Sequence, residues 1–162
     1  MIEIRPARRE DLPLVLDFVR ELAEYERLTS EVVATAADFE RALFGTPAYA
    51  HALIASDAGV AVGFAVYFFN FSTFLGRPGL YLEDLFVRPA ARGRGIGRAL
   101  LAHLAGLALA RGCGRLEWAV LDWNEPAIRF YRSLEALPNA EWTTYRLSGA
   151  ALDRLAASTP GA

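Results

Sequence analysis

The first 44 residues begin with a short alternating stretch and continue at helical spacing. Residues 2–5 alternate between apolar and charged side chains, which predicts a short strand. From Asp11 onward the apolar positions recur at the spacing of an amphipathic helix. Its buried stripe consists of Leu12, Val15, Leu16, Val19, Leu22 and Ala23. A second helix is predicted over residues 35–44, because Thr35 and Asp38 form a capping-box pattern at its start.

The middle of the chain combines apolar runs with turn signals. Two runs, residues 50–55 and 60–69, flank a Ser-Asp-Ala-Gly turn and predict a β-hairpin. A further strand is predicted over residues 80–87. It leads through a loop rich in glycine and arginine into residues 96–110, whose apolar stripe predicts a helix.

The last third continues the alternation of strands and helices. A strand is predicted over residues 116–121 and a helix over residues 125–134, with Asn124 as its N-cap. Residues 142–147 predict a last strand, and residues 150–156 a terminal helix.

These elements predict a single α/β domain. It covers residues 1–157 on a mixed sheet and is followed by a frayed tail, residues 158–162. Hydrophobic residues make up 54% of the chain and charged residues 22%, which excludes a disordered or fibrous class. The net charge of −2 argues against nucleic acid as a partner, since phosphate binding needs a basic face.

Metal and membrane binding are not expected. Cys113 is the only cysteine, and His51 and His103 lack the spacing of a metal site. No apolar stretch approaches the roughly 20 residues needed to cross a bilayer. The N-terminus shows no apolar leader, so a cytoplasmic location is expected.

The most informative segment runs from residue 85 to residue 101. An apolar strand feeds a loop that contains three glycines and opens directly into a helix. Glycines let the backbone approach a ligand closely, and a helix start offers unsatisfied N–H donors and a positive dipole end. Together with Arg92, Arg94 and Arg98, the loop fits a pyrophosphate cradle. A glycine-rich turn with solvated arginines explains the same pattern equally well.

Here a family resemblance becomes visible. Residues 92–97, Arg-Gly-Arg-Gly-Ile-Gly, resemble the (R/Q)-x-x-G-x-(G/A) signature of the GNAT superfamily. Residues 4–7, 21–26, 81–87 and 123–131 are similar to blocks of the spermidine/spermine (diamine) N-acetyltransferases. The resemblance implies a GNAT fold: a mixed, mostly antiparallel sheet of six to seven strands with helices on both faces. It also implies that the fourth and fifth strands splay apart.

The resemblance implies acetyl-CoA as co-substrate. The strand positions that would pair with the pantetheine arm are Leu85, Phe86 and Val87. The cradle positions are Gly93, Arg94, Gly95, Ile96, Gly97 and Arg98. A further segment matches at the next helix start and consists of Asn124, Glu125, Pro126 and Ala127. For Asn124, a plain helix cap is an equally good reading.

Two catalytic residues follow from the resemblance. Tyr131 matches the general acid that protonates the leaving thiolate, although packing of the helix would account for it from the sequence alone. Glu83 and Asp84 lie in an otherwise apolar strand, where adjacent acids need an explanation. Because strand neighbours point to opposite faces, only one of them is expected to line a given cleft. The resemblance favours Glu83, which would orient the amine and accept its proton through water; an ion pair with an arginine is the structural alternative.

The acceptor side is matched by acidic and aromatic residues, which suit a cation. The matching positions are Tyr25, Glu26, Glu83, Glu117, Trp118 and Ala119. We therefore expect transfer of acetyl from acetyl-CoA to a primary amine of a diamine, polyamine or lysine-like molecule, by direct attack in a ternary complex. The alternatives are a protein amine or amino-sugar acceptor, or a non-catalytic acyl-CoA-binding module. The resemblance also implies a homodimer.

One position departs from the family pattern. Glu135 stands where the family usually has a glycine after the catalytic tyrosine. That glycine normally ends the helix, so a different helix exit is expected here.

Overall fold

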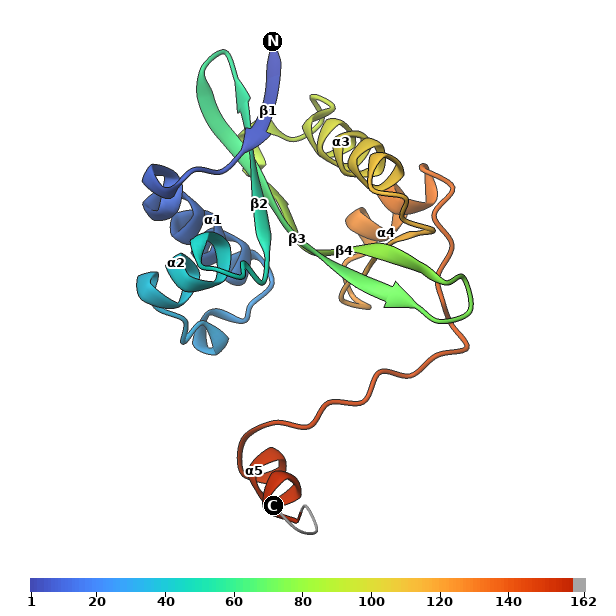
Figure 1. Ribbon diagram of the computed structural model, residues 1–162. Helices are drawn as coiled ribbons and strands as arrows, with labels where there is room; N and C mark the ends of the chain where they lie inside the picture. Colours follow the sequence, from blue (N-terminus) through green and yellow to red (C-terminus); the bar gives the residue numbers. More distant parts are fainter. Residues whose placement is uncertain (159–162) are drawn as a thin grey trace. The chain divides into compact units, whose positions relative to one another are not determined.

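The computed structural model describes residues 1–158, which divide into two compact units, one of residues 1–119 and a second that begins at Val120 (Figure 1). The expected single domain over residues 1–157 therefore stays a prediction. Of the expected tail, Ser158 is described and residues 159–162 lie outside the described part of the chain.

The first unit is built on one five-stranded sheet in the order β1-β2-β3-β4-β5. The first four strands are antiparallel neighbours, whereas β5 runs parallel to β4. The strands are β1 (Ile2–Pro6), β2 (His51–Asp57), β3 (Val60–Ser72), β4 (Arg77–Val87) and β5 (Leu116–Trp118). The mixed α/β architecture and the predicted hairpin are confirmed.

The expected count of six to seven strands is wrong, and residues 142–147 account for part of the difference. Within residues 1–158 only five strands form, and residues 142–147 adopt no regular structure. Trp142 and Tyr145 are 73% and 93% exposed. Alternating side chains indicate strand propensity, but a strand also needs a neighbour that satisfies its backbone N–H and C=O groups.

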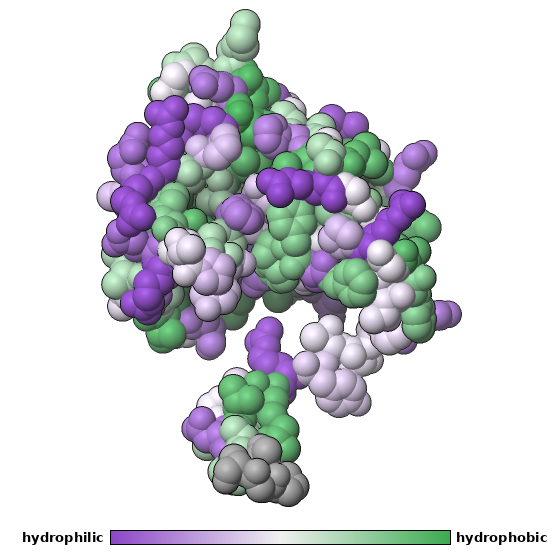
Figure 2. Space-filling view, in the orientation of Figure 1, coloured by the Kyte–Doolittle hydropathy of each residue, from purple (hydrophilic) through white to green (hydrophobic). Residues whose placement is uncertain are grey.

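Helices cover both faces of the sheet (Figure 1). On one face lie α1 (Leu12–Tyr25) and α2 (Ala36–Phe44), and on the other lies α3 (Ile96–Ala110). Three short 3₁₀ turns accompany them: η1 (Arg9–Asp11), η2 (Thr29–Glu31) and η3 (Pro89–Ala91). Hydrophilic residues gather on the outer side of α1 and α2, at the left of Figure 2.

Two apolar layers hold the first unit together. Val15, Phe18 and Leu22 of α1 pack with Phe64 and Phe86 of the sheet. The rings of Phe18 and Phe64 stack at 5.2 Å between their centroids. On the other face of the sheet, α3 buries the side chains of Ile96, Leu100 and Leu104. These layers confirm the apolar stripes predicted for both helices.

The pairing between the parallel strands β4 and β5 is short. β5 pairs only with Leu80, Tyr81 and Leu82 of β4, and β4 then continues to Val87. Residues 83–87 therefore have no pairing partner on β5, and the expected splaying of the fourth and fifth strands stays a prediction.

The second unit contains α4 (Glu125–Arg132) and α5 (Gly149–Ala157). The predicted N-cap is confirmed, because Asn124 Oδ1 accepts a hydrogen bond from the Ala127 amide at 3.4 Å. Every helix within residues 1–158 is too short or too polar to cross a bilayer.

Candidate functional site

The loop before α3 has the backbone geometry of an anion cradle. Gly93 and Gly95 have φ values of +75° and +82°, a left-handed conformation that glycine adopts without strain. A Cβ added at either position would meet nothing within 4 Å, so open space lies above the loop. The first amides of the 15-residue α3 have no carbonyl partner within the helix and lie at its positive dipole end. The loop can therefore receive a diphosphate.

Ile96 contributes to this cradle through its backbone alone, because its side chain is 1% exposed and packs in the core. Among the loop arginines, Arg94 forms an ion pair with Asp57. Arg98 is exposed. The loop thus combines backbone donors with positive side chains at its rim.

Arg92 connects the loop to the end of α1. Its Nε donates a hydrogen bond to the Val87 carbonyl at 2.9 Å. Its guanidinium lies over the rings of Tyr25 and Phe86, at 4.4 and 5.6 Å from their centroids. Cation–π contacts of this kind are worth roughly 0.5–1 kcal/mol at an exposed site. Tyr25 is thereby held beside the end of β4.

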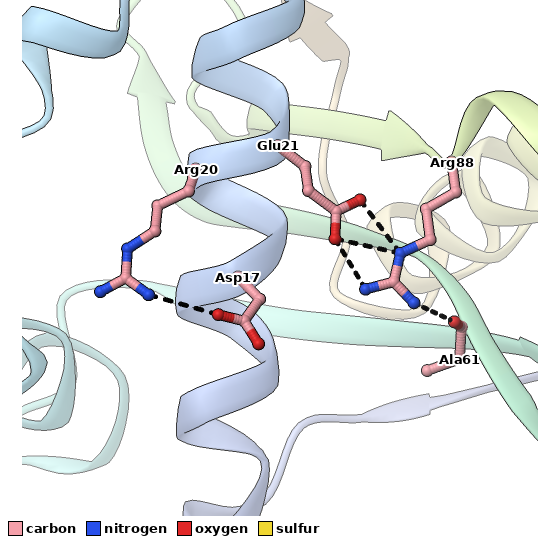
Figure 3. Close-up of polar contacts among 5 residues, drawn as sticks. All are labelled: Asp17, Arg20, Glu21, Ala61 and Arg88. Atoms are coloured by element: carbon pink, nitrogen blue, oxygen red, sulfur yellow. Dashed lines mark hydrogen bonds and ion pairs between the residues drawn. The ribbon is translucent and has the colours of Figure 1, made fainter.

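A second arginine fixes the start of the loop (Figure 3). The single Nε–H of Arg88 is shared between the two oxygens of the Glu21 carboxylate, at 3.0 and 3.1 Å, and Nη2 donates to the same carboxylate at 2.7 Å. Its Nη1 donates to the Ala61 carbonyl at 3.0 Å. The guanidinium also lies 4.6 Å from the centroid of the Phe18 ring. The forked pair attaches the end of β4 to α1 and so holds the cradle against the core.

An acidic pair lies where α1 ends beside β4. Burial, together with the neighbouring Glu83 and Glu26 carboxylates, raises the pKa of Asp84 to about 6. Burial also raises the pKa of Glu26. Both groups resist ionisation because water is excluded, and negative charges close to Asp84 add to the effect there. A cation bound between them would relieve that cost.

A β-bulge lies at Glu83, next to Asp84. Asp84 is opposite Val66 and Leu82 is opposite the next residue, Tyr67, so Glu83 is the extra residue on β4. The expectation that neighbouring acids point to opposite faces relied on regular alternation, which the bulge interrupts. Glu83 is exposed, whereas Asp84 is half-buried. The sequence analysis favoured Glu83 of these two neighbouring acids as the substrate-side group, and that role stays a prediction.

β5 contributes to the same face of the sheet. Glu117 is opposite Tyr81 in the β4–β5 register. Burial raises the pKa of the Tyr81 phenol, and Glu83 and Glu117 raise it further, which places both carboxylates near that ring. Trp118 is instead opposite the buried Leu82, so it lies on the other face from Glu117. The structure therefore places Glu117 and Trp118, two of the expected acceptor residues, on opposite faces of the sheet. The third, Ala119, is the last residue of the first unit.

The predicted residues of the second unit lie on and before α4. Asn124 is buried, and Tyr131 is half-buried, with its ring 5.5 Å from that of Phe130. Glu125 forms an exposed ion pair with Arg129 at 3.8 Å. The acid role of Tyr131 and the donor contacts of residues 124–127 stay predictions.

The exit of α4 keeps a glycine-type geometry without a glycine. The Ala136 amide donates to the Tyr131 carbonyl at 3.2 Å and the Glu135 amide to the Arg132 carbonyl at 3.0 Å. This is a Schellman motif, and Glu135 fills its left-handed position with a φ of +63°. The motif ties down the backbone of Tyr131.

Within residues 1–158, His, Cys, Asp and Glu side chains form no group of three that could hold an ion.

Comparisons with known proteins identify the family. The sequence model of the Acetyltransferase (GNAT) family matches residues 15–135. A thialysine N-epsilon-acetyltransferase of Bos taurus is 38% identical over 166 residues, covering 96% of this chain and 97% of the relative. The spermidine/spermine N(1)-acetyltransferase-like protein 1 of Homo sapiens is 35% identical over 142 residues, covering 83% of this chain and 20% of that protein. An integron cassette protein of V. cholerae has a solved structure that matches with a TM-score of 0.80 at 33% identity, covering 97% and 98% of the two chains.

The fold, the glycine-rich cradle and these matches define an acetyltransferase, and the chain belongs to the GNAT family. More narrowly, it is an N-acetyltransferase, since relatives at about 38% identity over most of its length bear that activity. The resemblance to the GNAT superfamily and its spermidine/spermine N-acetyltransferases is confirmed. The relatives support an enzyme rather than the alternative of a non-catalytic acyl-CoA-binding module. GNAT acetyltransferases use acetyl-CoA as their co-substrate.

Proposed function

We propose that this chain transfers the acetyl group of acetyl-CoA to a primary amine of a small cationic acceptor, by direct attack in a ternary complex. The observation that carries the proposal is the Asp84–Glu26 acidic pair at the end of α1, beside β4. It offers negative charge in a poorly hydrated place, which favours a bound ammonium group.

The donor is proposed to lie along β4 and the start of α3. Its diphosphate would meet the amides of residues 93–98 and the side chains of Arg94 and Arg98. The pantetheine arm would pair with the backbone of Leu85, Phe86 and Val87, which β5 does not reach. The Val87 carbonyl already accepts from Arg92 and has a second lone pair to offer. Residues 124–127 are proposed to add contacts at the start of α4.

The acceptor is proposed to bind as an ammonium ion and to react as a free amine. Asp84 and Glu26 would bind the ammonium group, and Glu83 would pass one proton to water. Tyr25 would form the aromatic wall of this pocket.

The chemical step then balances as follows. The free amine attacks the thioester carbonyl, so a C–N bond forms and the C–S bond breaks. The nitrogen loses a second proton as the amide forms. Tyr131 is proposed to protonate the departing thiolate, since a phenol can supply that proton within hydrogen-bond reach. The products are the acetylated amine, the thiol of CoA and one released proton.

A steady-state assay tests the proposal. The release of CoA thiol is followed with acetyl-CoA and a panel of amines, and the acetylated products are identified by mass spectrometry. We expect turnover with small amines carrying two basic groups. Replacing Tyr131 with phenylalanine is expected to lower kcat and leave both KM values near those of the wild type. A kcat that does not change would show that Tyr131 is not the acid.

The same panel separates the remaining acceptor classes. The bovine relative is named for thialysine, an amino acid, and the human relative for polyamines. Amino-sugars and peptide amines are included as the alternatives; turnover with these alone would overturn the small-amine proposal. A homodimer is part of the proposal, and sedimentation equilibrium of the purified chain tests it.

A further inference from the structure

Arg92 contacts residues of both proposed substrate sites. Its Nε donates a hydrogen bond to the Val87 carbonyl at 2.9 Å, in the stretch of β4 proposed to pair with the pantetheine arm. Its guanidinium lies 4.4 Å from the centroid of the Tyr25 ring, which is the proposed wall of the acceptor pocket. The sequence analysis counted this arginine among the charges of the cradle. In the structure, its charge is instead engaged with the end of α1.

The two contacts are made by one rigid group. A guanidinium is planar, so the direction of its Nε–H fixes the plane that lies over the ring. Phe86 supports both partners: its ring centroid lies 5.6 Å from Cζ of Arg92 and 6.5 Å from the centroid of the Tyr25 ring. Phe86 is 4% exposed and belongs to the apolar core, so it does not yield. A change at the Val87 carbonyl is therefore passed to Tyr25 through Arg92.

The end of α1 joins the position of Tyr25 to that of Glu26. Glu26 follows Tyr25 directly, and its amide donates to the Leu22 carbonyl at 2.9 Å. The Leu28 amide closes the same turn by donating to the Ala23 carbonyl at 2.8 Å. Because this turn is closed by hydrogen bonds on both sides, ordering the ring of Tyr25 also orders the backbone that carries the Glu26 carboxylate.

We propose that Arg92 is a positioning residue that couples the donor site to the acceptor site. The inference rests on the proposed function and makes the binding of one substrate depend on the other. Arg92 is exposed, so its side chain can lie on Tyr25 or extend into solvent. A donor paired with the second lone pair of the Val87 carbonyl would hold that carbonyl in place and so favour the state in which Arg92 lies on Tyr25. The acceptor pocket is then ordered before the amine binds.

The cation–π contact limits the size of this coupling. At an exposed site, such a contact is equivalent to about a two- to fivefold change in an equilibrium constant. Acetyl-CoA is therefore expected to tighten amine binding by up to about this factor. The amine is expected to tighten acetyl-CoA binding equally, because a coupling free energy is reciprocal.

Hydrogen exchange of the backbone amides, with acetyl-CoA as the only ligand, tests the coupling. Saturating acetyl-CoA is expected to slow exchange about two- to fivefold in peptides covering residues 22–28, in addition to protecting residues 85–98. Arg92→Gln separates the two contacts, because the glutamine Nε2 occupies the place of the arginine Nε and keeps a donor for Val87. The part of the side chain that lies over Tyr25 is deleted. We expect this variant to lose the protection of residues 22–28 and to keep that of residues 85–98. Tyr25→Leu removes the same contact from the other side and is expected to give the same result.

Arg98→Gln is the matched control. It removes the same charge from another exposed arginine, in the first turn of α3. It is expected to weaken acetyl-CoA binding but to keep the protection of residues 22–28 once acetyl-CoA is saturating. A general loosening of α1 in Arg92→Gln would change the exchange without ligand, not the difference that acetyl-CoA makes. In the amine assay, Arg92→Gln is expected to raise the KM for the amine about two- to fivefold, a larger factor than any fall in kcat.

The outcomes separate the coupling from the proposed function. Protection of residues 22–28 that is lost in Arg92→Gln or in Tyr25→Leu supports the coupling. Protection that persists in both variants overturns it. No protection of residues 22–28 in the wild type, or faster exchange there on addition of acetyl-CoA, also overturns the coupling and leaves the proposed function intact. A wild type without protection in residues 85–98 overturns the proposed donor site itself.

Discussion

Replacing Asp84 with asparagine is expected to stabilise the chain at neutral pH while it weakens acetyl transfer. The two side chains have the same shape, so the change removes a charge and little else. Asp84 is half-buried beside Glu83 and Glu26, and these surroundings make its ionised form costly in the folded state. The same cost favours a bound ammonium group, so the variant loses the group that the acceptor needs.

The magnitude follows from the shift of the Asp84 pKa. The folded-state pKa is about 6 against an ordinary value of 3.8, so the folded state binds more protons than the unfolded state between these pH values. The free energy of unfolding therefore falls as pH rises through this window, by roughly 3 kcal/mol for a shift of about two units. Burying the asparagine amide returns about 1 kcal/mol of that gain. The net stabilisation at pH 7 is thus about 2 kcal/mol.

Urea denaturation followed by circular dichroism measures this difference. Wild type and Asp84→Asn are compared at pH 7 and at pH 3.5, where Asp84 is protonated in the folded state and mostly protonated in the unfolded state. We expect the variant to be the more stable protein at pH 7 and to lose that advantage at pH 3.5. Asp17→Asn, which removes an exposed carboxylate from α1, controls for net charge.

Two results would refute the reasoning. A variant that is less stable than the wild type at pH 7 would mean that Asp84 is well paired when ionised. A stability difference that is the same at both pH values would mean that it does not arise from the charge of Asp84.

Further predictions concern the helix ends, the cradle and the acceptor. α1 and α4 end in Schellman motifs whose left-handed positions hold Arg27 and Glu135, whereas Gly112 fills the same position after α3. Arg27→Gly and Glu135→Gly should each raise the free energy of unfolding by up to about 1 kcal/mol, and Gly112→Ala should lower it; destabilised glycine variants would contradict this. Gly95→Ala should weaken acetyl-CoA binding about tenfold by calorimetry, because an L-residue is strained there by about 1–2 kcal/mol and its methyl group enters the space above the loop. Gly59→Ala, equally strained at a φ of +80° in the β2–β3 turn, should bind acetyl-CoA normally; an equal loss in both would point to strain alone. The KM for the amine should rise as pH falls through about 6 in the wild type and stay flat in Asp84→Asn; a KM that rises equally in both would show that another group titrates.

Local signals made much of the fold predictable. The apolar stripes of α1 and α3, the turn between β2 and β3 and the caps at Thr35 and Asn124 each depend on residues close in sequence. The turn of the glycine-rich loop before α3 could also be predicted, since a left-handed backbone favours glycine and Gly93 and Gly95 adopt that conformation. In these places the short-range physics and the final structure agree.

Features that depend on distant partners were not predictable. The strand expected over residues 142–147 had the right alternation, but alternation does not supply a neighbouring strand. The bulge at Glu83 is set by the register between β3 and β4, and only that register shows that Asp84 belongs to the acidic pair. The two arginine contacts on α1, Arg88 with Glu21 and Arg92 with Tyr25, join residues more than sixty positions apart.

Hydrogen exchange of the backbone amides, followed by mass spectrometry with and without acetyl-CoA, tests the central claim most directly. That claim is that β4 and the start of α3 receive the acetyl donor. We predict that acetyl-CoA slows exchange in peptides covering residues 85–98 and leaves the β1–β2 peptides unchanged. Protection confined to other parts of the chain, or no protection at saturating acetyl-CoA, would contradict the account.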